Sequence, residues 1–247
     1  MRILTANEAW FSFKGISCRD YSVRMVSPPA RLHPSRKGEY IGIPGADGEL
    51  WFDGGGYDPI FISVHCIAED NLNIDDINAW LSGKGDLIFG DEPERVYKAS
   101  ITGEYARNNL YGVMRGQEFT VSFDCEPYRY NADPDGDTVT ITESETPINN
   151  PGTVASLPLL EVEGHGDGNL MIGQNTLLFY DLEANKPIYV DCAAKIAYTG
   201  TGAANDPLIL ATQHLTGDWV SIDPGLNFVT YTGGIQSVTI VPRWRWL

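Results

Sequence analysis

The stretch from Asn73 to Ala99 constrains the fold of this chain more than any other segment. Three apolar residues recur at the helical period and share one face, namely Ile74, Ile77 and Leu81. They predict a short helix over residues 74–82, which Gly83 ends because glycine accepts the backbone conformation that closes a helix. Asn73 or Asp75 can cap the first turn, where free N–H groups need acceptors.

Two short strands are expected directly after this helix. Leu87–Phe89 is apolar, the acidic segment Asp91–Pro93 predicts a turn, and Val96–Tyr97 resumes an extended pattern. The order is therefore helix, strand, turn and strand.

The clearest strand runs from Glu118 to Glu126. Polar residues alternate with four apolar ones, Phe119, Val121, Phe123 and Cys125. Successive side chains of a strand point to opposite faces, so this strand has one buried and one solvated face. Such a pattern favours antiparallel sheets and hence a mainly β protein.

A hairpin and an exposed loop are expected earlier in the chain. Tyr40–Ile43 and Leu50–Phe52 flank the turn Gly45–Gly48, which is a hairpin signal. The preceding segment, Ser27–Tyr40, is polar, basic and rich in proline, so it is expected to be an exposed loop or arm.

The second half of the chain predicts an all-β sandwich. Short strands recur at spacings typical of sandwiches, at Leu159–Val162, Asn169–Ile172, Thr176–Leu182, Ile188–Cys192, Phe228–Tyr231 and Ser237–Val241. A proline-bearing stretch with one strand, Thr138–Thr142, precedes them. We therefore expect an N-terminal β domain over residues 1–130, a junction over 131–150 and a C-terminal domain over 151–247.

The order of these segments resembles that of siphophage distal tail proteins. In the first half the resemblance is carried by Trp80–Gly83, Leu87, Asp91–Pro93 and Tyr97. In the second half it is carried by Asn150–Thr153, Asp181–Leu182, Asp191–Cys192, Ile222–Asn227 and Ser237–Arg243. These motifs are structural, built on glycine and proline turns.

The resemblance implies a structural virion protein that joins the tail tube to the host-binding tip or baseplate. Its N-terminal split-barrel or sandwich-like domain, with one short helix, would form a ring, commonly a homo-hexamer. Its C-terminal jelly-roll or galectin-like sandwich would face outward. The implied partners are the tail tube protein and tail-tip or receptor-binding proteins. The implied location is the tail tip of the virion, after assembly in the host cytoplasm.

Three basic residues in or near the loop are candidates for an oligomer-contact arm: Arg31, Arg36 and Lys37. They stand out because the chain is otherwise acidic, and a basic arm would pair with a neighbour's acidic surface. An ordinary mobile loop is the alternative.

Four aromatic residues of the second half support a different function. If Trp219, Tyr231, Trp244 and Trp246 were exposed, they could dock a protein or stack on sugars, which would make this half a carbohydrate-binding module at the host surface. Trp244 and Trp246 fall on one face of a terminal strand, with Arg243 and Arg245 on the other. Closing the sandwich core is the alternative role of these aromatics.

The charge of the chain argues against nucleic-acid and anionic-membrane partners. The net charge is −16; residues 1–130 hold 19 acids and 13 bases, giving −6, and residues 131–247 hold 14 acids and 4 bases, giving −10. Such a surface repels phosphate groups, which suits a ring that lets DNA pass without gripping it. No segment approaches the ~20 apolar residues of a membrane-spanning helix, and no secretory leader is expected.

The sequence contains no catalytic, metal-binding or cofactor-binding pattern, so an enzyme and a bound cofactor are not expected. The four cysteines are far apart and are expected to be buried thiols. The Asp133–Asp137 turn is the best metal candidate, but it lacks the glycine and the distal acid of a calcium-binding loop. The Ser82–Gly85 segment lacks the spacing of a phosphate-binding loop.

Overall fold

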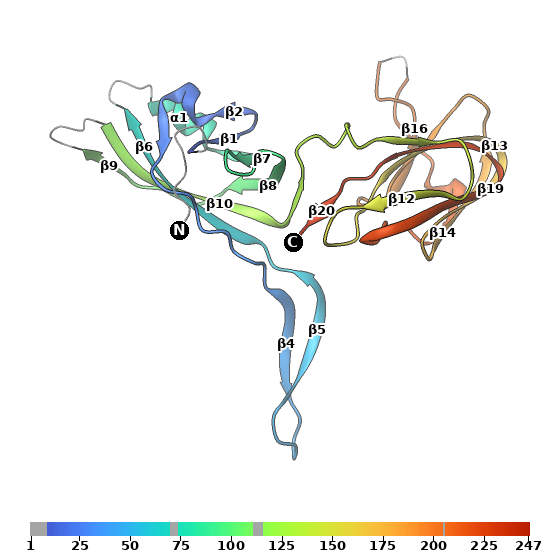
Figure 1. Ribbon diagram of the computed structural model, residues 1–247, viewed down its shortest axis with the longest axis horizontal. Helices are drawn as coiled ribbons and strands as arrows, with labels where there is room; N and C mark the ends of the chain where they lie inside the picture. The colour runs from blue at the N-terminus through green and yellow to red at the C-terminus, as the bar shows by residue number, and fades with distance from the viewer. Residues whose placement is uncertain (1–8, 70–73, 111–115, 205) are drawn as a thin grey trace. The chain divides into compact units, whose positions relative to one another are not determined.

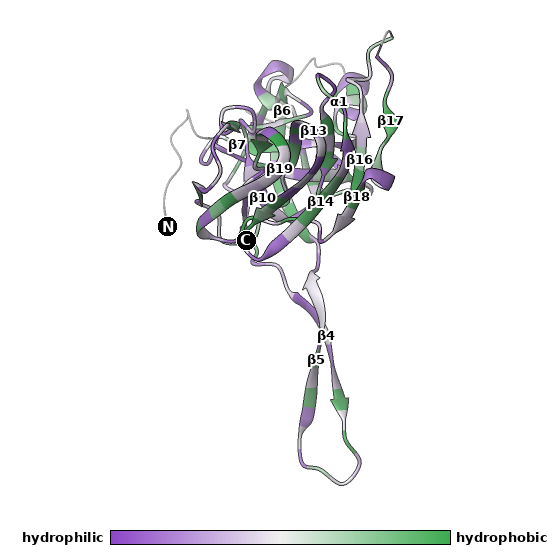
Figure 2. Ribbon diagram, turned by 90° about the vertical axis from the view of Figure 1, so that its right-hand side faces the viewer, coloured by the Kyte–Doolittle hydropathy of each residue, from purple (hydrophilic) through white to green (hydrophobic). Residues whose placement is uncertain are grey.

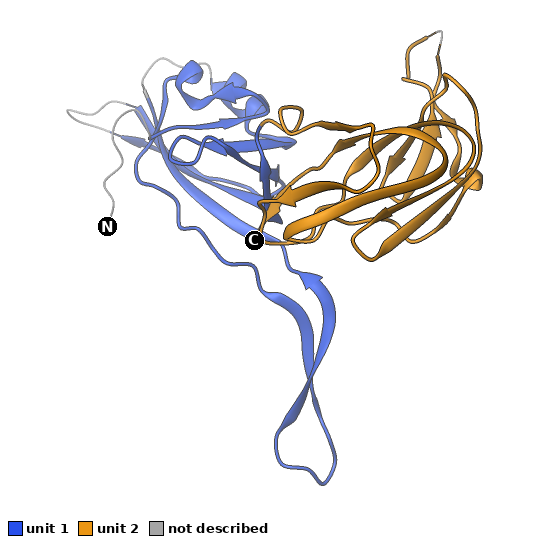
Figure 3. Cartoon of the chain, turned by 45° about the vertical axis from the view of Figure 1, so that its right-hand side comes forward, with its two compact units in different colours: residues 1–132, 247 blue, residues 133–246 orange. Residues whose placement is uncertain are grey.

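The computed structural model describes residues 9–69, 74–110, 116–204 and 206–247. Strands dominate the described residues, and the expectation of a mainly β protein is confirmed (Figure 1). The chain divides into two compact units, unit 1 with residues 1–132 and 247, and unit 2 with residues 133–246 (Figure 3).

Unit 1 is built on a curled antiparallel sheet in which the strand order is β2-β1-β7-β8-β10-β6-β3, with β9 beside β10. Its strands are β1 (Phe11–Phe13), β2 (Ile16–Ser17), β3 (Val23–Met25), β6 (Ile60–Glu69), β7 (Gly83–Phe89), β8 (Arg95–Ile101), β9 (Arg107–Leu110) and β10 (Gly116–Asn131). A short 3-10 helix, η1 (Cys18–Tyr21), follows β2.

The expected helix is present as α1 (Ile74–Trp80), and Gly83 follows it with φ +74°. The predicted cap Asn73 lies outside the described residues. Trp80 is 3% exposed, stacks on Phe11 at 5.6 Å between ring centroids and donates its indole N–H to the Phe13 carbonyl oxygen at 2.9 Å. The helix therefore covers the core of unit 1 rather than offering a ligand site.

Strand β10 confirms the alternating pattern and extends it at both ends. Phe119, Val121, Phe123 and Cys125 are buried. On the opposite face the Ser122 hydroxyl lies 2.9 Å from that of Ser63 on β6. The strand is longer than its alternation predicts because it pairs with β6 along one edge and with β9 and β8 along the other.

The expected hairpin is also confirmed, and it is longer than predicted. β4 (Arg36–Gly42) and β5 (Glu49–Tyr57) form a two-stranded sheet of their own, in which Tyr40 lies opposite Trp51 and Ile41 opposite Leu50 (Figures 1 and 2). The last residues of the expected loop, from Arg36 onward, belong to this hairpin.

Unit 2 contains an antiparallel sheet in the order β11-β19-β13-β15-β16-β17, with β12 beside β19, β14 beside β13 and β18 beside β14. Its strands are β11 (Val139–Ile141), β12 (Thr146–Asn150), β13 (Leu159–Ile172), β14 (Asn175–Leu182), β15 (Ile188–Asp191), β16 (Ile196–Thr199), β17 (Ile209–Leu210), β18 (Leu215–Gly217), β19 (Gly225–Val241) and β20 (Arg245–Trp246). A 3-10 helix, η2 (Thr212–His214), precedes β18.

Four of the strands expected in unit 2 merge, two by two, into two long and irregular strands. Leu159–Val162 and Asn169–Ile172 both belong to β13, and the two segments expected near the C-terminus both belong to β19. The register of the β13–β19 pair shifts around Gly164 and Gly168. A β-carbon at Gly234 would lie 1.8 Å from the carbonyl oxygen of His165, so glycine permits the close approach of the two backbones there.

The segment expected as a junction, residues 131–150, contains the one strand predicted in it and a second strand that was not predicted. This segment supplies β11 and β12, and both strands pair with β19 inside unit 2. Its prolines and the Asp133–Asp137 turn predict an irregular linker, but pairing with a distant strand makes most of it part of the second sheet.

Candidate interaction surfaces

The β4–β5 hairpin exposes six large apolar side chains. Their exposed fractions lie between 40% and 67%, and they are Tyr40, Ile41, Ile43, Leu50, Trp51 and Phe52. Figure 2 shows green, hydrophobic segments in the outer half of the hairpin. Exposed apolar patches of this kind mark surfaces that bind a partner.

Both faces of the hairpin carry apolar side chains. Residues directly opposite each other share a face, so Tyr40 and Trp51 lie together, with ring centroids 4.8 Å apart in an edge-to-face contact. Ile41 and Leu50 share the other face with Phe52. A two-stranded ribbon is marginally stable in water by itself, so a partner that covers these faces would stabilise it.

The candidate residue Arg36 lies at the base of the hairpin and pairs within it. Its Nε is 2.9 Å from Oδ2 of Asp53, and its guanidinium lies over the Tyr57 ring at 5.6 Å. The hydrogen bond from Arg36 lowers the pKa of the Asp53 carboxyl. The second candidate, Lys37, is exposed beside it on β4.

The third candidate, Arg31, lies outside the hairpin. Its guanidinium is 2.7 Å from the Asp91 carboxylate and lies 4.0 Å from the centre of the Phe89 ring. Arg36 and Lys37 thus lie at the base of the hairpin, whereas Arg31 is tied to the sheet of unit 1. The apolar surface of the hairpin is more prominent than these three basic residues. Its signal in the sequence was the presence of apolar residues on both faces of the predicted hairpin.

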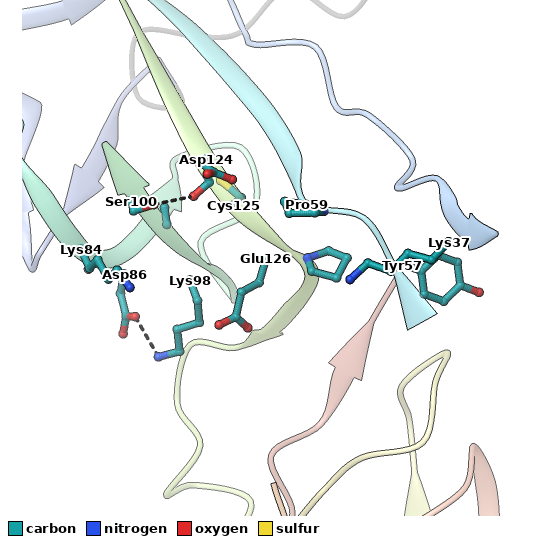
Figure 4. Close-up of a pocket in the computed structure, with 13 residues that line it drawn as sticks. Lys37, Tyr57, Pro59, Lys84, Asp86, Lys98, Ser100, Asp124, Cys125 and Glu126 are labelled. Atoms are coloured by element: carbon teal, nitrogen blue, oxygen red, sulfur yellow. Dashed lines mark hydrogen bonds and ion pairs between the residues drawn. The ribbon is translucent and has the colours of Figure 1, made fainter. Parts of the chain in front are cut away.

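A groove of about 490 Å³ lies at the base of the hairpin (Figure 4). It is lined by Lys37 and Tyr57 of the hairpin, Lys84 and Lys98 of the neighbouring strands, and Glu126 and Pro127 of β10. Lys37 and Lys84 lie at opposite ends of it in Figure 4. Lys98 is 2.8 Å from the Asp86 carboxylate, so that pair is internally neutralised.

Comparison with known proteins connects this architecture to phage tails. The sequence matches no protein-family model and no curated protein. Among solved structures, the Dit (gp 19.1) protein of phage SPP1 aligns with a TM-score of 0.68 at 18% identity, covering 96% of this chain and 99% of that one. That protein is described as a paradigm of the hub adsorption apparatus in phages that infect Gram-positive bacteria. The chain has the fold of a phage tail hub protein.

A second structure agrees with this hub fold. A chain of the phage P2 baseplate in its activated conformation with Ca aligns with a TM-score of 0.51 at 7% identity, covering 94% of this chain and 97% of that chain. The resemblance to distal tail proteins is thus confirmed at the level of the fold, over both units.

In the hub fold the aromatic candidates of unit 2 pack against its core. Trp244 is 5% exposed, which agrees with the alternative that it closes the sandwich core and leaves it unavailable for docking or for stacking on sugars. Trp219, Tyr231 and Trp246 are partly buried against the same core. Trp244 directly precedes β20, and its neighbour Arg243 forms two hydrogen bonds with the Asp191 carboxylate, at 2.9 and 3.1 Å.

Other apolar side chains of unit 2 are exposed, and the sequence reasoning missed them. Leu208, Ile209 and Leu210 lie at or beside β17, the edge strand of the sheet, and each is more than half exposed. Leu226 and Phe228 project from β19 with exposed fractions of 66% and 52%. A single short edge strand gives too weak a periodic pattern to be recognised from sequence.

The polar groups that could take part in metal binding or catalysis have structural partners. An Asp133 carboxylate oxygen accepts the Gly136 backbone N–H at 3.1 Å and closes the predicted turn. His65 Nε2 lies 2.5 Å from a carboxylate oxygen of Glu118 on the paired strand. Within the described ranges, no group of three or more His, Cys, Asp or Glu side chains is arranged to hold a metal ion.

The four cysteine thiols are buried and free of disulfides. Burial raises the pKa of Cys125 and of Cys192 to about 12, and it also raises the pKa of Cys18 and Cys66. Such thiols are poor nucleophiles. In the part of the chain that the structure describes, no helix is long and apolar enough to span a membrane.

Proposed function

We propose that this protein is a structural hub component of a phage tail, which oligomerises into a ring between the tail tube and the host-binding tip. The observation that carries the proposal is the extent of the hub fold, which covers 96% of this chain and 99% of SPP1 Dit, so that both units have counterparts.

The exposed hairpin supports oligomerisation. A closed ring needs head-to-tail interfaces, in which one surface of a subunit meets a different surface of the next. The apolar hairpin supplies one such surface on unit 1, and burying the exposed part of side chains such as Leu50 and Phe52 would contribute on the order of 1 kcal/mol each. Six copies are expected for the ring, by the resemblance to distal tail proteins.

The acidic surface suits a ring through which DNA passes. Residues 131–247 carry 14 acids and 4 bases. Binding to a duplex depends on neutralising its phosphates with basic side chains, and this half of the chain has few to offer. The proposed role therefore includes no nucleic-acid binding.

Unit 2 is proposed to dock tail-tip or receptor-binding proteins. Its edge strand β17 and the exposed Leu208–Leu210 segment support this assignment, because exposed edge strands with apolar side chains readily add a strand from a partner. The sugar-binding alternative has less support, since Trp244 belongs to the core.

Mass photometry of the purified chain, alone and mixed with its tail tube protein, tests the ring. We expect a discrete species at a fixed multiple of 27.2 kDa, six copies being the expected number, and ring-shaped particles in negative-stain images. A strictly monomeric protein under both conditions would overturn the proposal.

A hairpin variant relates the ring to the surface proposed to form it. Trp51→Ser with Phe52→Ser removes apolar area from the hairpin and should shift the population to monomers. Phe228→Ser removes a similarly exposed aromatic residue from unit 2 and should leave the ring intact.

A further inference from the structure

We propose that one face of unit 2 binds a basic surface of another protein of the tail. This face, called the outer face below, is the side of strands β12, β19 and β13 that points away from the core of unit 2. Its apolar centre consists of Pro147, Met171, Leu226 and Phe228. The inference rests on the docking role proposed for unit 2, and it names a surface and the chemistry of its partner.

The alternation along β19 places two large apolar side chains on the outer face. Asn227 and Val229 are buried, while Leu226 and Phe228 are 66% and 52% exposed. Successive side chains of a strand point to opposite faces, so the two exposed residues lie on the side away from the core. Packing within unit 2 therefore does not account for them.

The neighbouring strands add apolar side chains beside these two. Pro147 on β12 lies directly opposite Phe228, and Met171 on β13 lies opposite Thr230, two residues further along β19. Residues opposite each other in an antiparallel pair share a face, and large side chains also reach their diagonal neighbours. Pro147 is exposed and Met171 is 40% exposed. The apolar residues thus form one continuous patch across three strands.

Carboxylates flank this patch at both ends. Glu145 directly precedes β12, and Asp223 lies two residues before β19. Because the two strands are antiparallel, these acids lie at opposite ends of the strand pair. Both side chains are exposed, so each is accessible to a cation of a partner.

The segments that build the outer face contain acidic residues and no basic ones. Residues 143–150, 169–182 and 218–230 contain no lysine or arginine. Their five acids are Glu143, Glu145, Asp181, Asp218 and Asp223. None of the five forms an ion pair with another residue that the structure describes. A surface of this composition attracts a basic partner and repels an acidic one.

The occupant is a different protein and not a second copy of unit 2. Two outer faces brought together would place carboxylates against carboxylates, and like charges across an interface are costly. Unit 2 also offers few cations, because Lys186 and Arg243 are already paired with Glu183 and Asp191. A partner surface with apolar side chains inside a rim of lysine or arginine complements both the patch and its carboxylates.

The outer face and the edge strand β17 can be tested separately. The strand order places β17 at one end of the sheet, beyond β15 and β16, whereas the outer face spans β12, β19 and β13. Leu210→Ser changes the edge strand, and Leu226→Ser with Phe228→Ser changes the outer face.

Biolayer interferometry on the full chain tests the outer face. The probes are the purified tail-tip and receptor-binding proteins of the same phage, each measured by itself. Leu226→Ser with Phe228→Ser should weaken the binding of one probe roughly tenfold or more. The melting temperature should not change, because both residues are exposed. Val26→Ser, at a 48% exposed position of unit 1, is the matched control and should leave binding unchanged.

Charge reversal tests the chemistry of the partner. Glu145→Lys with Asp223→Lys should weaken the same binding roughly tenfold or more, and added salt should weaken the binding of the wild-type chain. Glu104→Lys with Asp135→Lys changes the net charge equally at exposed positions outside the outer face, and its effect should be much smaller. Equal effects of the two pairs would overturn the pairing of a basic partner with this face.

The outcomes separate this inference from the proposed function. A probe that binds the wild type and both outer-face variants equally well overturns the outer face alone, and Leu210→Ser then shows whether β17 carries the docking. A wild-type chain that binds none of the probes overturns the docking role together with this inference, while the ring is judged separately by mass photometry. Two copies that associate through the outer face would overturn the assignment of a different protein as the occupant.

Discussion

The indole ring of Trp51 lies against Gly38 on the partner strand of the hairpin. A β-carbon at Gly38 would be 2.2 Å from Cζ2 of Trp51 and 2.6 Å from the carbonyl oxygen of Phe52. Glycine thus lets Trp51 lie flat on the ribbon, where it meets Tyr40 edge to face. The aromatic face of the hairpin depends on this one missing side chain.

We expect Gly38→Ala to displace the indole of Trp51 and to weaken ring formation. The melting temperature of the monomer should stay unchanged, because the hairpin forms a sheet of its own. Tryptophan fluorescence and mass photometry measure the two effects. Gly42→Ala on the same strand is the control, since a β-carbon there meets nothing within 4 Å. Equal behaviour of the two variants would contradict the role of the Trp51–Gly38 contact.

Replacing Arg31 should destabilise unit 1 rather than the ring. Arg31→Ala removes the ion pair with Asp91 and the stacking on Phe89, and we expect a loss of about 1–2 kcal/mol in the free energy of unfolding. Urea denaturation measures it, with Lys37→Ala as an exposed cationic control. A normal stability combined with a lost ring would instead assign Arg31 to an oligomer contact.

Trp244→Ala should strongly destabilise unit 2. Truncating a large buried aromatic residue typically costs about 3–5 kcal/mol, whereas Phe228→Ala at an exposed site should change the stability by no more than about 0.5 kcal/mol. Thermal denaturation of both variants tests this difference. If Trp244→Ala kept full stability but lost binding on a glycan array, the sugar-binding alternative would be supported.

The stability of unit 2 should fall in acid through Asp191. Burial raises the pKa of this carboxyl, but the hydrogen bonds from Arg243 and from the Ala193 and Ala194 backbone outweigh it, and the pKa is lowered. A lowered pKa means that the stabilisation is complete above the ordinary carboxyl pKa of about 3.9. The stabilisation is lost as the pH falls through the lower pKa that the Asp191 carboxyl has in the folded state.

Denaturation between pH 6 and pH 2 measures this effect, with Asp191→Asn as the test variant. The variant should be less stable than the parent at pH 6 and should lose less stability on acidification. A parallel decline of parent and variant would remove Asp191 as a source of the acid sensitivity. Asp135→Asn, at an exposed turn, serves as the control.

The thiols should be unreactive in the folded protein. With the pKa of Cys125 and Cys192 at about 12, almost no thiolate is present at pH 8. A thiol-specific chromogenic reagent should therefore label none of the four cysteines in the native state and all four in urea. Rapid labelling of a native thiol would show an opening of the core that contains it.

Local patterns determined several elements of this protein from the sequence alone. The helix at 74–80, the glycine turn of the hairpin and the alternation along β10 each follow from neighbouring residues, because backbone preferences and side-chain periodicity act over a few positions. The order of these elements was also enough to identify the resemblance that the hub fold confirms.

Contacts between residues far apart in the sequence follow from the folded sheets and not from local patterns. Arg31 pairs with a carboxylate 60 positions away and Arg243 with one 52 positions away, and β11 and β12 find their partner in β19. The same applies to the burial of Trp244 and to the groove that joins the hairpin base to β7, β8 and β10. These contacts depend on how the sheets close around their cores, and no local pattern records that closure.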